Sequence, residues 1–259
     1  MSLGICLLSQ IPGRAEPDDR AEIVTQILFG ESFIVLKKNK KWSYVQLTYD
    51  NYKCWICNKQ YKIISNQEFD NITGAEQIAC TSDLMGFVRI ENTSIPIVLG
   101  STLPNFDGEK GSIDNMEYTY DGSIIMASKK SFNKQNIVPT AFKYLNAPYL
   151  WGGRSPFAID CSGLTQMVYK MNGIKLPRDA KDQAKVGESL SFVEEAQPGD
   201  LAFFDNQDGE IVHVGIILEG NRIIHASGKV RIDQIDHQGI FNQEIKDYSH
   251  KLRLLKKVV

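Results

Sequence analysis

The stretch that decides the fold of the C-terminal half covers residues 157–173 and reads "FAIDCSGLTQMVYKMNG". Its apolar residues recur at the i, i+3, i+4, i+7 spacing of an amphipathic helix: Leu164, Met167, Val168 and Met171. This spacing predicts a helix over residues 161–171, and Gly173 follows it as a stop signal. Cys161 opens the predicted helix, and Asp160 directly before it is a residue type that caps helix N-termini.

A cysteine at the start of a helix is a candidate nucleophile. The thiolate is the reactive form, and it needs a positive local field and a proton acceptor. The helix N-terminus supplies the field, and its unpaired N–H groups could lower the thiol pKa and hold an oxyanion. Gly163, two residues after Cys161, lets backbone approach a substrate closely. The alternative is an inert buried cysteine, a common environment for this residue type.

Two histidines downstream could supply the proton acceptor. Residues 211–218, "IVHVGIIL", predict a strand in which His213 and Gly215 share one face. Residues 219–221, Glu-Gly-Asn, suit a three-residue hairpin loop. That loop pairs Gly215 with His225, so His213 becomes the diagonal neighbour of His225 at roughly 5–8 Å. A two-residue loop would place the histidines on opposite faces, and a lone histidine in a strand is more often a core residue.

The remaining histidines and cysteines carry weaker signals. His237 and His250 lie in polar surroundings and are predicted at the surface. The cysteines are odd in number and irregularly spaced, unlike a disulfide framework: Cys6, Cys54, Cys57, Cys80 and Cys161. The Cys54–Cys57 pair has CxxC spacing without a second ligand pair nearby. We expect two thiols of a strand there, with zinc binding or redox use as the alternative.

Length, charge and hydropathy argue against several functional classes for this protein. The chain has 259 residues, enough for about two to three domains. With 29 Lys and Arg against 31 Asp and Glu, it lacks the basic excess of nucleic-acid binders. No apolar run approaches the ~20 residues of a membrane span. The run at residues 5–8 is too short for a signal peptide. We therefore expect a cytoplasmic protein, or one of the periplasm or cell envelope if a leader was removed.

The first half of the chain has a different sequence pattern, with no long amphipathic helix. Short strands separated by turns are expected at residues 22–29, 32–36, 42–47 and 53–56, with more β-rich pieces at 95–99 and 123–126. Strands this short and closely spaced predict small barrels. From about residue 129 the pattern changes to a helix at residues 136–145, followed by a loop and the nucleophile helix.

The N-terminal residues resemble a known domain type. "RAEPDDRAEIVTQILFGESFIVLKK" at residues 14–38 and "KWSYVQLTYDNYKCWI" at residues 41–56 resemble a bacterial SH3-like (SH3b) domain of the kind fused to cell-wall peptidases. We expect this SH3b domain over residues 1–62 and a second SH3-like domain over 63–128. Residues 129–259 are then left for a catalytic domain.

The C-terminal residues carry a more specific resemblance. It rests on "APYLWGGRSPFAIDCSGLTQMVYKMNGIKLPRDAKDQA" at residues 147–184, "QPGDLAFFD" at 197–205 and "IVHVGIILEGNRIIHASG" at 211–228. These segments resemble the NlpC/P60 family of papain-like cysteine peptidases. Together with the SH3b segment they resemble the dipeptidyl-peptidase-VI-like, YkfC-like γ-D-glutamyl-L-diamino acid endopeptidases. The implied fold class is α+β, with a papain-like NlpC/P60 catalytic domain preceded by two small SH3-like β-barrels.

The resemblance implies roles for the candidate residues. Cys161 would attack the carbonyl carbon of a γ-D-glutamyl amide, and His213 would take the thiol proton and deliver one to the leaving amine. His225 would orient the His213 ring. The Cys161 backbone N–H and Tyr149 would hold the oxyanion. No metal or cofactor is implied.

Substrate-binding residues are carried over in the same way. Asp179 would bind a free peptide amine, with an exposed loop carboxylate as the alternative. Ser162 and Arg178 would hold the D-Glu α-carboxylate or shape its pocket, and Trp151 would wall the cleft. The chain departs from related enzymes at Ala180, where serine is frequent, so one hydrogen bond of about 0.5–1.5 kcal/mol could be missing.

The SH3b domain is implied to reach the cleft as well. Glu16 matches the position of a glutamate near the amine, and the matching tyrosine is Tyr52, with Tyr49 as the second choice. A site that pairs a buried carboxylate with an ammonium rejects an acylated N-terminus. The predicted partner is therefore a murein-derived peptide, L-Ala-γ-D-Glu-diamino acid, in peptidoglycan turnover or recycling. The alternatives are a papain-like amidase or acyltransferase on cell-wall material and a non-enzymatic wall-binding protein.

Overall fold

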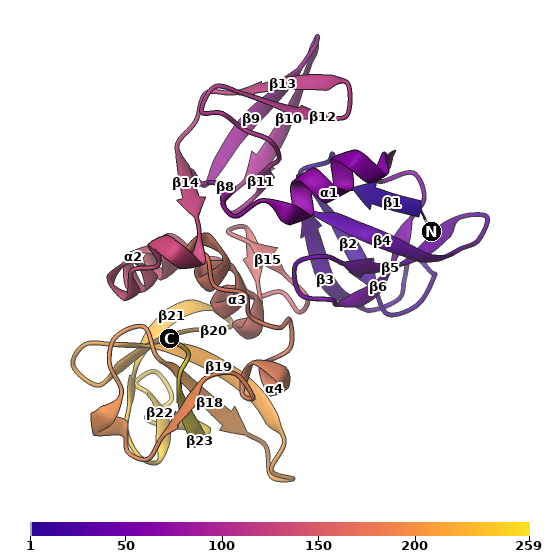
Figure 1. The fold of residues 1–259 in the computed structure, drawn as a ribbon. Coiled ribbons are helices and arrows are strands. Elements are labelled where there is room, and N and C mark those ends of the chain that lie inside the picture. Colours follow the sequence, from indigo (N-terminus) through magenta and orange to yellow (C-terminus); the bar gives the residue numbers. More distant parts are fainter. Residues whose placement is uncertain (1) are drawn as a thin grey trace. The chain divides into compact units, whose positions relative to one another are not determined.

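The computed structural model describes residues 2–259 as mostly β-strands with a few short helices (Figure 1). The chain divides into two compact units. Unit 1 comprises the described residues up to Ser131 together with Trp151–Pro156. Unit 2 comprises Phe132–Leu150 and Phe157–Val259. None of the helices in residues 2–259 is long and apolar enough to cross a membrane.

The first part of unit 1 is a seven-stranded antiparallel sheet. In pairing order its strands are β3 (Ile23–Leu28), β2 (Gln10–Arg14), β6 (Lys53–Cys57), β5 (Trp42–Leu47), β4 (Ser32–Lys38), β1 (Ser2–Ile5) and β7 (Lys62–Ile64). The strands predicted at residues 22–29, 32–36, 42–47 and 53–56 are thus present as β3, β4, β5 and β6, β5 with its predicted bounds. Alternate side chains of these strands form one buried core, including Ile11, Ile27, Phe33, Val45 and Ile56.

The second part of unit 1 begins with a helix that the sequence analysis missed. Helix α1 (Asn66–Gly74) is capped by Ser65, whose hydroxyl accepts a hydrogen bond from the Glu68 backbone N–H. A serine followed three residues later by a glutamate is a recognisable helix start, so the signal was present in the sequence.

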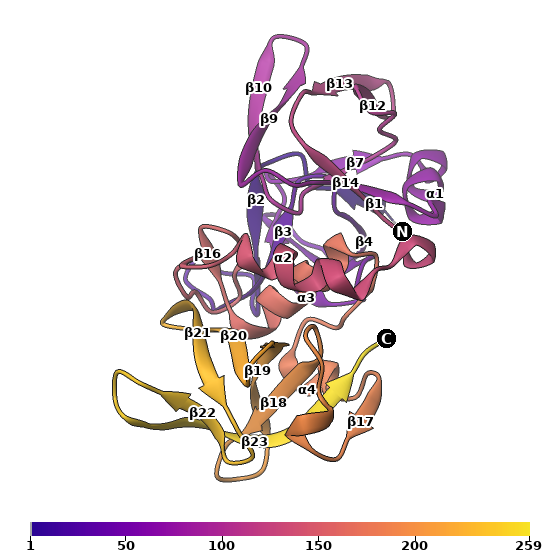
Figure 2. The same ribbon diagram turned by 90° about the vertical axis from the view of Figure 1, so that its left-hand side faces the viewer.

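Two smaller sheets follow α1 in unit 1. One contains β10 (Thr93–Val98), β9 (Met85–Ile90), β13 (Met116–Tyr120) and β12 (Lys110–Ile113), and the other contains β11 (Thr102–Leu103), β8 (Ile78–Thr81) and β14 (Ile124–Ala127). The hairpin of β9 and β10 is seen from its side in Figure 2. Ile5 and Phe29 share one core with Tyr118 of β13, so the two parts of unit 1 are packed together. That residues 63–128 are a second SH3-like barrel stays a prediction.

The segment Trp151–Pro156 is fastened to unit 1 by a buried ion pair. The guanidinium of Arg154 in β15 (Arg154–Ser155) binds both carboxylate oxygens of Glu31, at 2.7 and 2.9 Å. Its Nη1 also donates to the Gln26 carbonyl at 2.8 Å. Gly152 lies at φ 79°, and a Cβ there would come within 2.3 Å of the Ile23 carbonyl oxygen. Only glycine therefore fits this approach.

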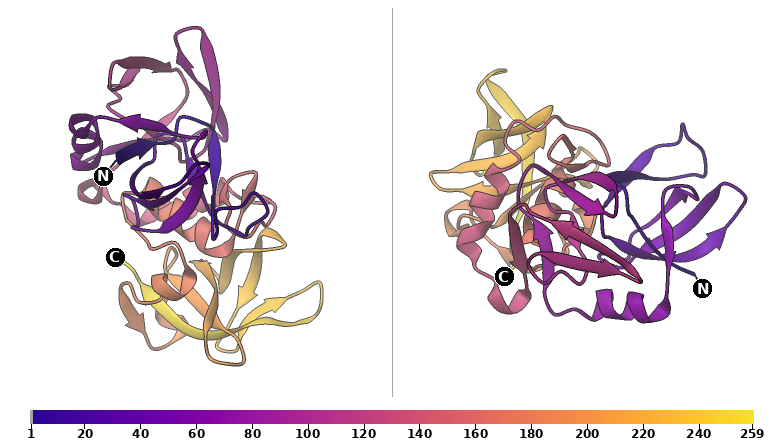
Figure 3. Two further views of the ribbon diagram at one scale, coloured as in Figure 1. Left: turned by 90° about the vertical axis from the view of Figure 1, so that its right-hand side faces the viewer. Right: turned by 90° about the horizontal axis from the view of Figure 1, so that it is seen from above.

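Unit 2 is built around a closed sheet. Its strands pair in the order β17 (Glu188–Leu190), β23 (Asp247–Lys257), β18 (Leu201–Asp205), β19 (Ile211–Leu218), β20 (Arg222–Ser227), β21 (Lys229–Ile235) and β22 (Gly239–Asn242). Because β22 also pairs with β23, the strands β18 to β23 close into a six-stranded barrel. The orange-to-yellow strands of this barrel can be followed in both views of Figure 3. Buried apolar side chains, among them Phe204, Ile223 and Ile240, form its core.

Helices cover part of this sheet. Helix α3 (Cys161–Met171) has the predicted bounds and packs against β19 and β20. The helix expected at residues 136–145 is shorter, as α2 (Ile137–Phe142). The remaining short elements are α4 (Ala180–Gln183), β16 (Ala158–Ile159) and the 3₁₀ turns η1 (Lys129–Ser131), η2 (Lys134–Asn136) and η3 (Val193–Glu195). That the whole domain is papain-like stays a prediction.

Candidate active site

The nucleophile candidate lies where α3 meets strand β19. Asp160 caps α3, and its Oδ1 accepts a hydrogen bond from the Gly163 backbone N–H at 2.6 Å, which confirms the predicted cap. The backbone N–H groups of Ser162 and Val214 lie close enough to the Cys161 sulfur to lower its pKa. Val214 directly follows His213 in β19, so the thiol lies against the strand that carries the candidate base.

The thiol is not activated in the way that the helix position suggested. Burial and, second to it, the carboxylate of Asp160 raise the pKa of Cys161 to about 12, against the lowering effects of the two N–H groups and of Arg178. The expectation of a lowered pKa was therefore wrong, because the side chain is almost fully buried and has a carboxylate beside it. In the resting site the thiol is neutral.

A buried polar network holds the N-terminus of α3. Arg178 donates through Nη1 to Asp160 Oδ1 at 3.0 Å and through Nη2 to Asp160 Oδ2 at 2.5 Å, and Nη1 also reaches Ser162 Oγ at 2.9 Å. Gln183 donates to the Ser162 and Pro177 carbonyls at 2.9 and 2.8 Å. Its own carbonyl accepts from Thr165 Oγ1 at 2.6 Å. Sequence reasoning did not single out Gln183, which ties the loop before α4 to the helix.

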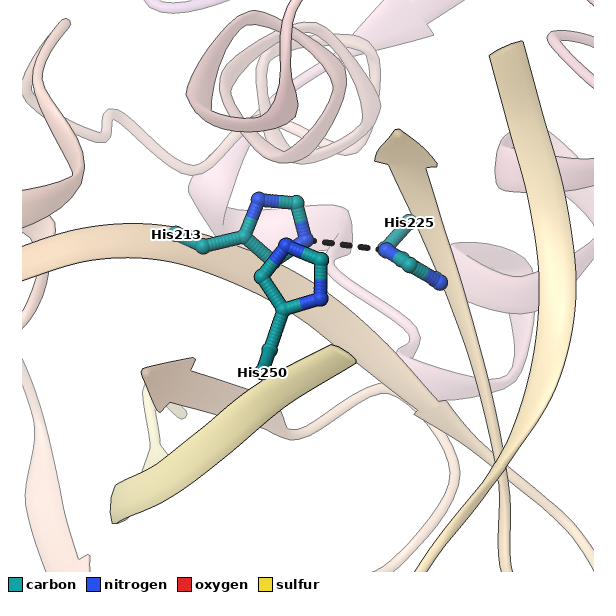
Figure 4. A group of neighbouring side chains, drawn as sticks. All are labelled: His213, His225 and His250. Carbon is teal, nitrogen blue, oxygen red and sulfur yellow. Dashed lines mark hydrogen bonds between the residues drawn. The ribbon is translucent and has the colours of Figure 1, made fainter. Parts of the chain in front are cut away.

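The two candidate histidines meet as the hairpin parity predicts. Gly215 pairs with His225 across β19 and β20, so the three-residue loop and its register are confirmed. His213 Nε2 lies 2.9 Å from His225 Nδ1, with the ring planes at 87° (Figure 4). A Cβ on Gly215 would come within 2.9 Å of the His225 Cβ and 2.7 Å of Ile223 Cδ1. Glycine thus leaves the room that the histidine pair needs.

A carboxylate extends this pair to a third strand. Asp233 in β21 lies with Oδ2 3.0 Å from His225 Nε2. Arg231 binds the same carboxylate, from Nε to Oδ2 at 2.7 Å and from Nη2 to Oδ1 at 3.0 Å. Sequence reasoning missed both residues because β21 was not predicted. The two branched apolar residues at 230 and 232 were the available strand signal.

Burial and hydrogen bonding set the protonation states of His213, His225 and Asp233. It holds the pKa of His213 well below 6.5, and the nearby His250 and His225 lower it further. Burial also lowers the pKa of His225, although Asp233 opposes this. For Asp233 burial acts to raise the pKa, but hydrogen bonds from His225 and Arg231 outweigh it and leave the pKa below its usual value. At neutral pH the site holds neutral imidazoles and an ionised carboxylate.

His250 is also part of the site, although the sequence analysis placed it at the surface. It is half-buried, which makes the predicted surface position wrong, and its ring stacks on that of His213 with centroids 4.0 Å apart and planes at 24° (Figure 4). Burial lowers the pKa of His250 to about 4. Tyr248, His250 and Leu252 are the more buried residues of an alternating stretch in β23. That period-2 pattern was a signal that the sequence offered.

The three histidines could be considered as metal ligands. One nitrogen from each lies within 4.8 Å of the others. A metal ion lies near the plane of each imidazole that binds it, along the nitrogen lone pair. The stacked rings of His213 and His250 direct their lone pairs side by side, so one ring would have to turn. The arrangement suits a proton pathway better than a metal site.

Two regions of the chain match known families. Residues 146–248 match the NlpC/P60 family, and residues 13–60 match the bacterial dipeptidyl-peptidase Sh3 domain. Residues 146–248 are an NlpC/P60 domain. The resemblance inferred from the sequence motifs is thereby confirmed, as is that of the N-terminal SH3 domain.

Several known proteins are similar to most of this chain. The chain is 29% identical over 220 residues to the gamma-D-glutamyl-L-lysine dipeptidyl-peptidase of Bacillus subtilis (strain 168), covering 79% of this chain and 72% of the relative. It is 29% identical over 251 residues to dipeptidyl-peptidase 6 of Lysinibacillus sphaericus, covering 86% and 88%. A crystal structure of an NlpC/P60 family protein from Bacillus cereus ATCC 10987 has the same fold, at 20% identity, a TM-score of 0.83 and 99% coverage of both chains.

Two further predicted site residues belong to the same unit as Cys161. Tyr149 is 36% exposed, and burial, Cys161 and Asp160 together raise the pKa of its phenol to about 12. Asp179 precedes α4 and is half-buried, and its backbone carbonyl accepts from Asp182 and Gln183. Both residues therefore lie in unit 2 with Cys161, within the region that matches the NlpC/P60 family.

The other predicted substrate residues belong to unit 1. Trp151 is 58% exposed, and its indole N–H donates to Glu22 Oε1 at 2.5 Å. Glu16 is exposed, and Tyr52 and Tyr49 are half-buried, Tyr52 against the sheet core. Their place in a cleft stays a prediction.

Proposed function

We propose that this protein hydrolyses the γ-D-glutamyl-L-diamino acid bond of murein peptides that carry a free N-terminal L-Ala. The broader class, a cysteine peptidase and hence a hydrolase, is confirmed by the comparisons with the NlpC/P60 family. The observation that carries the proposal is the placement of Cys161 against the strand of His213, whose ring is hydrogen-bonded to His225. The name of the Bacillus subtilis relative, gamma-D-glutamyl-L-lysine dipeptidyl-peptidase, supports the choice of bond.

In the first half of the reaction, the Cys161 sulfur attacks the carbonyl carbon of the γ-D-glutamyl amide. Because the thiol pKa is about 12 and the His213 pKa lies well below 6.5, the resting pair is neutral. The thiol proton therefore passes to His213 as the S–C bond forms. His213 then gives this proton to the leaving amine of the diamino acid, and the C–N bond breaks to leave a thioester. Water, deprotonated by His213, attacks the thioester carbonyl carbon. The C–S bond breaks, the γ-carboxylate is released, and His213 returns the proton to the Cys161 sulfur.

The developing oxyanion needs hydrogen-bond donors. The backbone N–H of Cys161 is in the first turn of α3 and makes no hydrogen bond within residues 2–259. Tyr149 keeps its phenol proton at neutral pH because its pKa is raised to about 12. We assign these two groups to the oxyanion, each contributing through a bond that strengthens as charge develops.

Substrate selection is assigned to acidic and aromatic side chains. Asp179, with Glu16 and Tyr52 of the SH3 domain, would pair with the free amine. The Arg178 guanidinium is already paired with Asp160 and Ser162, which favours shaping the pocket over direct binding of the D-Glu carboxylate. Ser162 then acts with Arg178 in that role, and Trp151 would wall the cleft. A cytoplasmic recycling role stays a prediction.

The test compares two substrates in parallel. Purified protein is incubated with L-Ala-γ-D-Glu-meso-diaminopimelate and with the same tripeptide linked to muramic acid, and the products are identified by mass spectrometry. We expect L-Ala-D-Glu and free diaminopimelate from the first substrate alone, and nothing from Cys161→Ser. Equal cleavage of both substrates contradicts recognition of the free amine. Absence of cleavage of either contradicts the proposed bond.

A further inference from the structure

We propose that Asp233 is a positioning residue that sets the tautomers of both histidines and leaves Nδ1 of His213 as the proton acceptor. Its effect on turnover rests on the proposed peptidase function, whereas its effect on the histidine protons does not. No residue of β21 was singled out by the sequence motifs, and the residue acts through His225 without approaching the substrate.

The first step fixes the proton on the outer nitrogen of His225. An ionised carboxylate only accepts hydrogen bonds. Asp233 is held ionised by the two-point contact with Arg231, at 2.7 and 3.0 Å. The nitrogen that faces it at 3.0 Å, His225 Nε2, must therefore carry a proton.

The second step passes this choice to His213. A neutral imidazole carries one proton, so a neutral His225 with Nε2 protonated has a bare Nδ1. That Nδ1 accepts from His213 Nε2 at 2.9 Å, which makes His213 the donor. His213 then has its proton on Nε2 and a bare Nδ1 on the side of the ring away from His225 (Figure 4). A bare Nδ1 is what a base for the Cys161 thiol requires.

The hydrogen-bonded chain of His213, His225 and Asp233, called the relay below, follows from the sheet register. Each of its two contacts joins residues with the same two-residue offset between neighbouring strands. Gly215 pairs with His225, and His213 lies two residues before Gly215 in β19. Ile223 pairs with Asp233, and His225 lies two residues after Ile223 in β20. The three side chains are therefore diagonal neighbours on one face of adjacent strands.

Water does not readily replace the carboxylate. The His225 side chain is 1% exposed and that of Asp233 is 4% exposed. A buried N–H without a partner is costly, so removal of the carboxylate favours the other tautomer of His225. That tautomer would donate from Nδ1 to His213 and move the His213 proton to Nδ1, where it blocks proton transfer from the thiol.

The first experiment reads the protons directly. The chain contains four histidines, so ¹⁵N-histidine labelling gives a spectrum with few signals. Two-bond ¹H–¹⁵N correlation spectra at neutral pH should show His213 and His225 as Nε2–H tautomers in the wild type. In Asp233→Ala we expect a shift of both toward Nδ1–H. Nδ1–H in wild-type His213, or unchanged tautomers in Asp233→Ala, would overturn the proposal.

The second experiment reads the consequence for catalysis. For Asp233→Ala we expect kcat to fall about 10- to 100-fold, as for the outer partners of metal-bound histidines, with KM changed less than about twofold. The alkylation rate of Cys161 by iodoacetamide, followed by peptide mapping, should fall with it. Asp233→Asn retains an acceptor for His225 and should recover part of both rates. Equal losses in Asp233→Asn and Asp233→Ala, or a loss confined to KM, would count against a positioning role.

A matched control separates this role from loss of a charge or of folding. Asp121 pairs with Arg89 at 2.8 Å on the surface of unit 1, with 68% and 54% of the side chains exposed. Asp121→Ala should leave kcat, tautomers and alkylation unchanged, and thermal unfolding shows which variants are folded. If wild-type protein cuts no murein peptide while tautomers and alkylation respond as described, the proposed function fails and the relay stands. Cleavage by Asp233→Ala at the wild-type rate overturns the relay alone.

Discussion

Each unit of this molecule contains a buried arginine held by both oxygens of a carboxylate. In unit 1 Arg154 binds Glu31, and in unit 2 Arg178 binds Asp160. All four side chains are at most 6% exposed. The surroundings differ. Arg154 also binds backbone at Gln26 and fastens a chain segment, whereas Asp160 also caps α3 and directly precedes the nucleophile candidate.

The comparison shows that a buried arginine–carboxylate pair can have a purely structural role, as in unit 1, or can also affect the nucleophile, as in unit 2. A buried ion pair adds little net stability, but loss of one partner leaves a costly uncompensated charge. Around Arg154 that rigidity holds backbone in place. Around Asp160 it also sets the field at Cys161, because the carboxylate raises the thiol pKa and Arg178 lowers it. Mutations in the two pairs should therefore resemble each other in stability and differ in thiol chemistry.

The largest effect is expected for Asp160→Ala. It leaves Arg178 buried without its partner, at a cost of about 3–5 kcal/mol, and removes the helix cap, at a cost of about 1 kcal/mol. The Cys161 pKa should fall, because a negative neighbour is lost and a positive one remains. Urea unfolding measures the first change, and the pH profile of Cys161 alkylation measures the second.

The double variant Asp160→Ala with Arg178→Met sharpens this prediction. Removal of both charges should restore part of the lost stability, since no buried charge is left unpaired. An unfolding free energy no higher than that of Asp160→Ala alone would show that the cap, and not the ion pair, dominates at this site.

The counterpart in unit 1, Glu31→Ala, is expected to come second. It leaves Arg154 buried without its partner and should lower the free energy of unfolding by about 3–5 kcal/mol, with no cap to add. The Cys161 alkylation profile of the folded protein should keep its wild-type pKa. A shifted profile would contradict the separation of a purely structural pair from one that tunes the thiol.

Local features of the site were predictable from the sequence, whereas features that depend on barrel closure were not. Helix α3, its cap and the His213–His225 contact follow from local periodicity and from the parity of one short loop. Asp233 and His250 lie on β21 and β23, which become neighbours of the site only when the barrel closes. That closure depends on long-range pairing, which no local pattern encodes.

The raised pKa of Cys161 was missed for a related reason. A helix N-terminus predicts a positive field, but burial and the orientation of Asp160 are properties of the folded domain. In unit 1 the strands at residues 22–56 were predictable from short β-rich runs separated by turn residues. The ion pair of Arg154 with Glu31 joins residues far apart in sequence and left no signal in either segment.

A third test compares alanine substitutions at one glycine of each unit, Gly215 in unit 2 and Gly74 in unit 1. In Gly215→Ala the new Cβ would come within 2.9 Å of the His225 Cβ, so the ring must move. A displacement near 1 Å can cost about 100-fold in rate, and we expect a 10- to 100-fold fall in kcat with about 1–3 kcal/mol lost in stability. Gly74→Ala is the control, because nothing lies within 4 Å of its Cβ position. Wild-type kcat in Gly215→Ala would show that the histidine contact tolerates displacement.

The smallest effect is expected in the pH dependence of stability, which the histidine cluster confers on unit 2. The His250 pKa is about 4 in the folded state and about 6.5 when unfolded. Between these values the unfolded chain binds the proton more readily, so the contribution of His250 is full above pH 6.5 and is lost as the pH falls toward 4. His250→Phe keeps a ring against His213 and removes this titration.

Urea unfolding at pH 7 and pH 5 tests this directly. Wild-type protein should lose more stability between the two pH values than His250→Phe does. The exposed His237 supplies the control, since His237→Gln should keep the wild-type dependence. If His250→Phe instead loses as much stability as wild type, the acid sensitivity must come from His213 and His225, whose pKa values are also lowered by burial. The stacked ring would then serve the site by its packing on His213 alone.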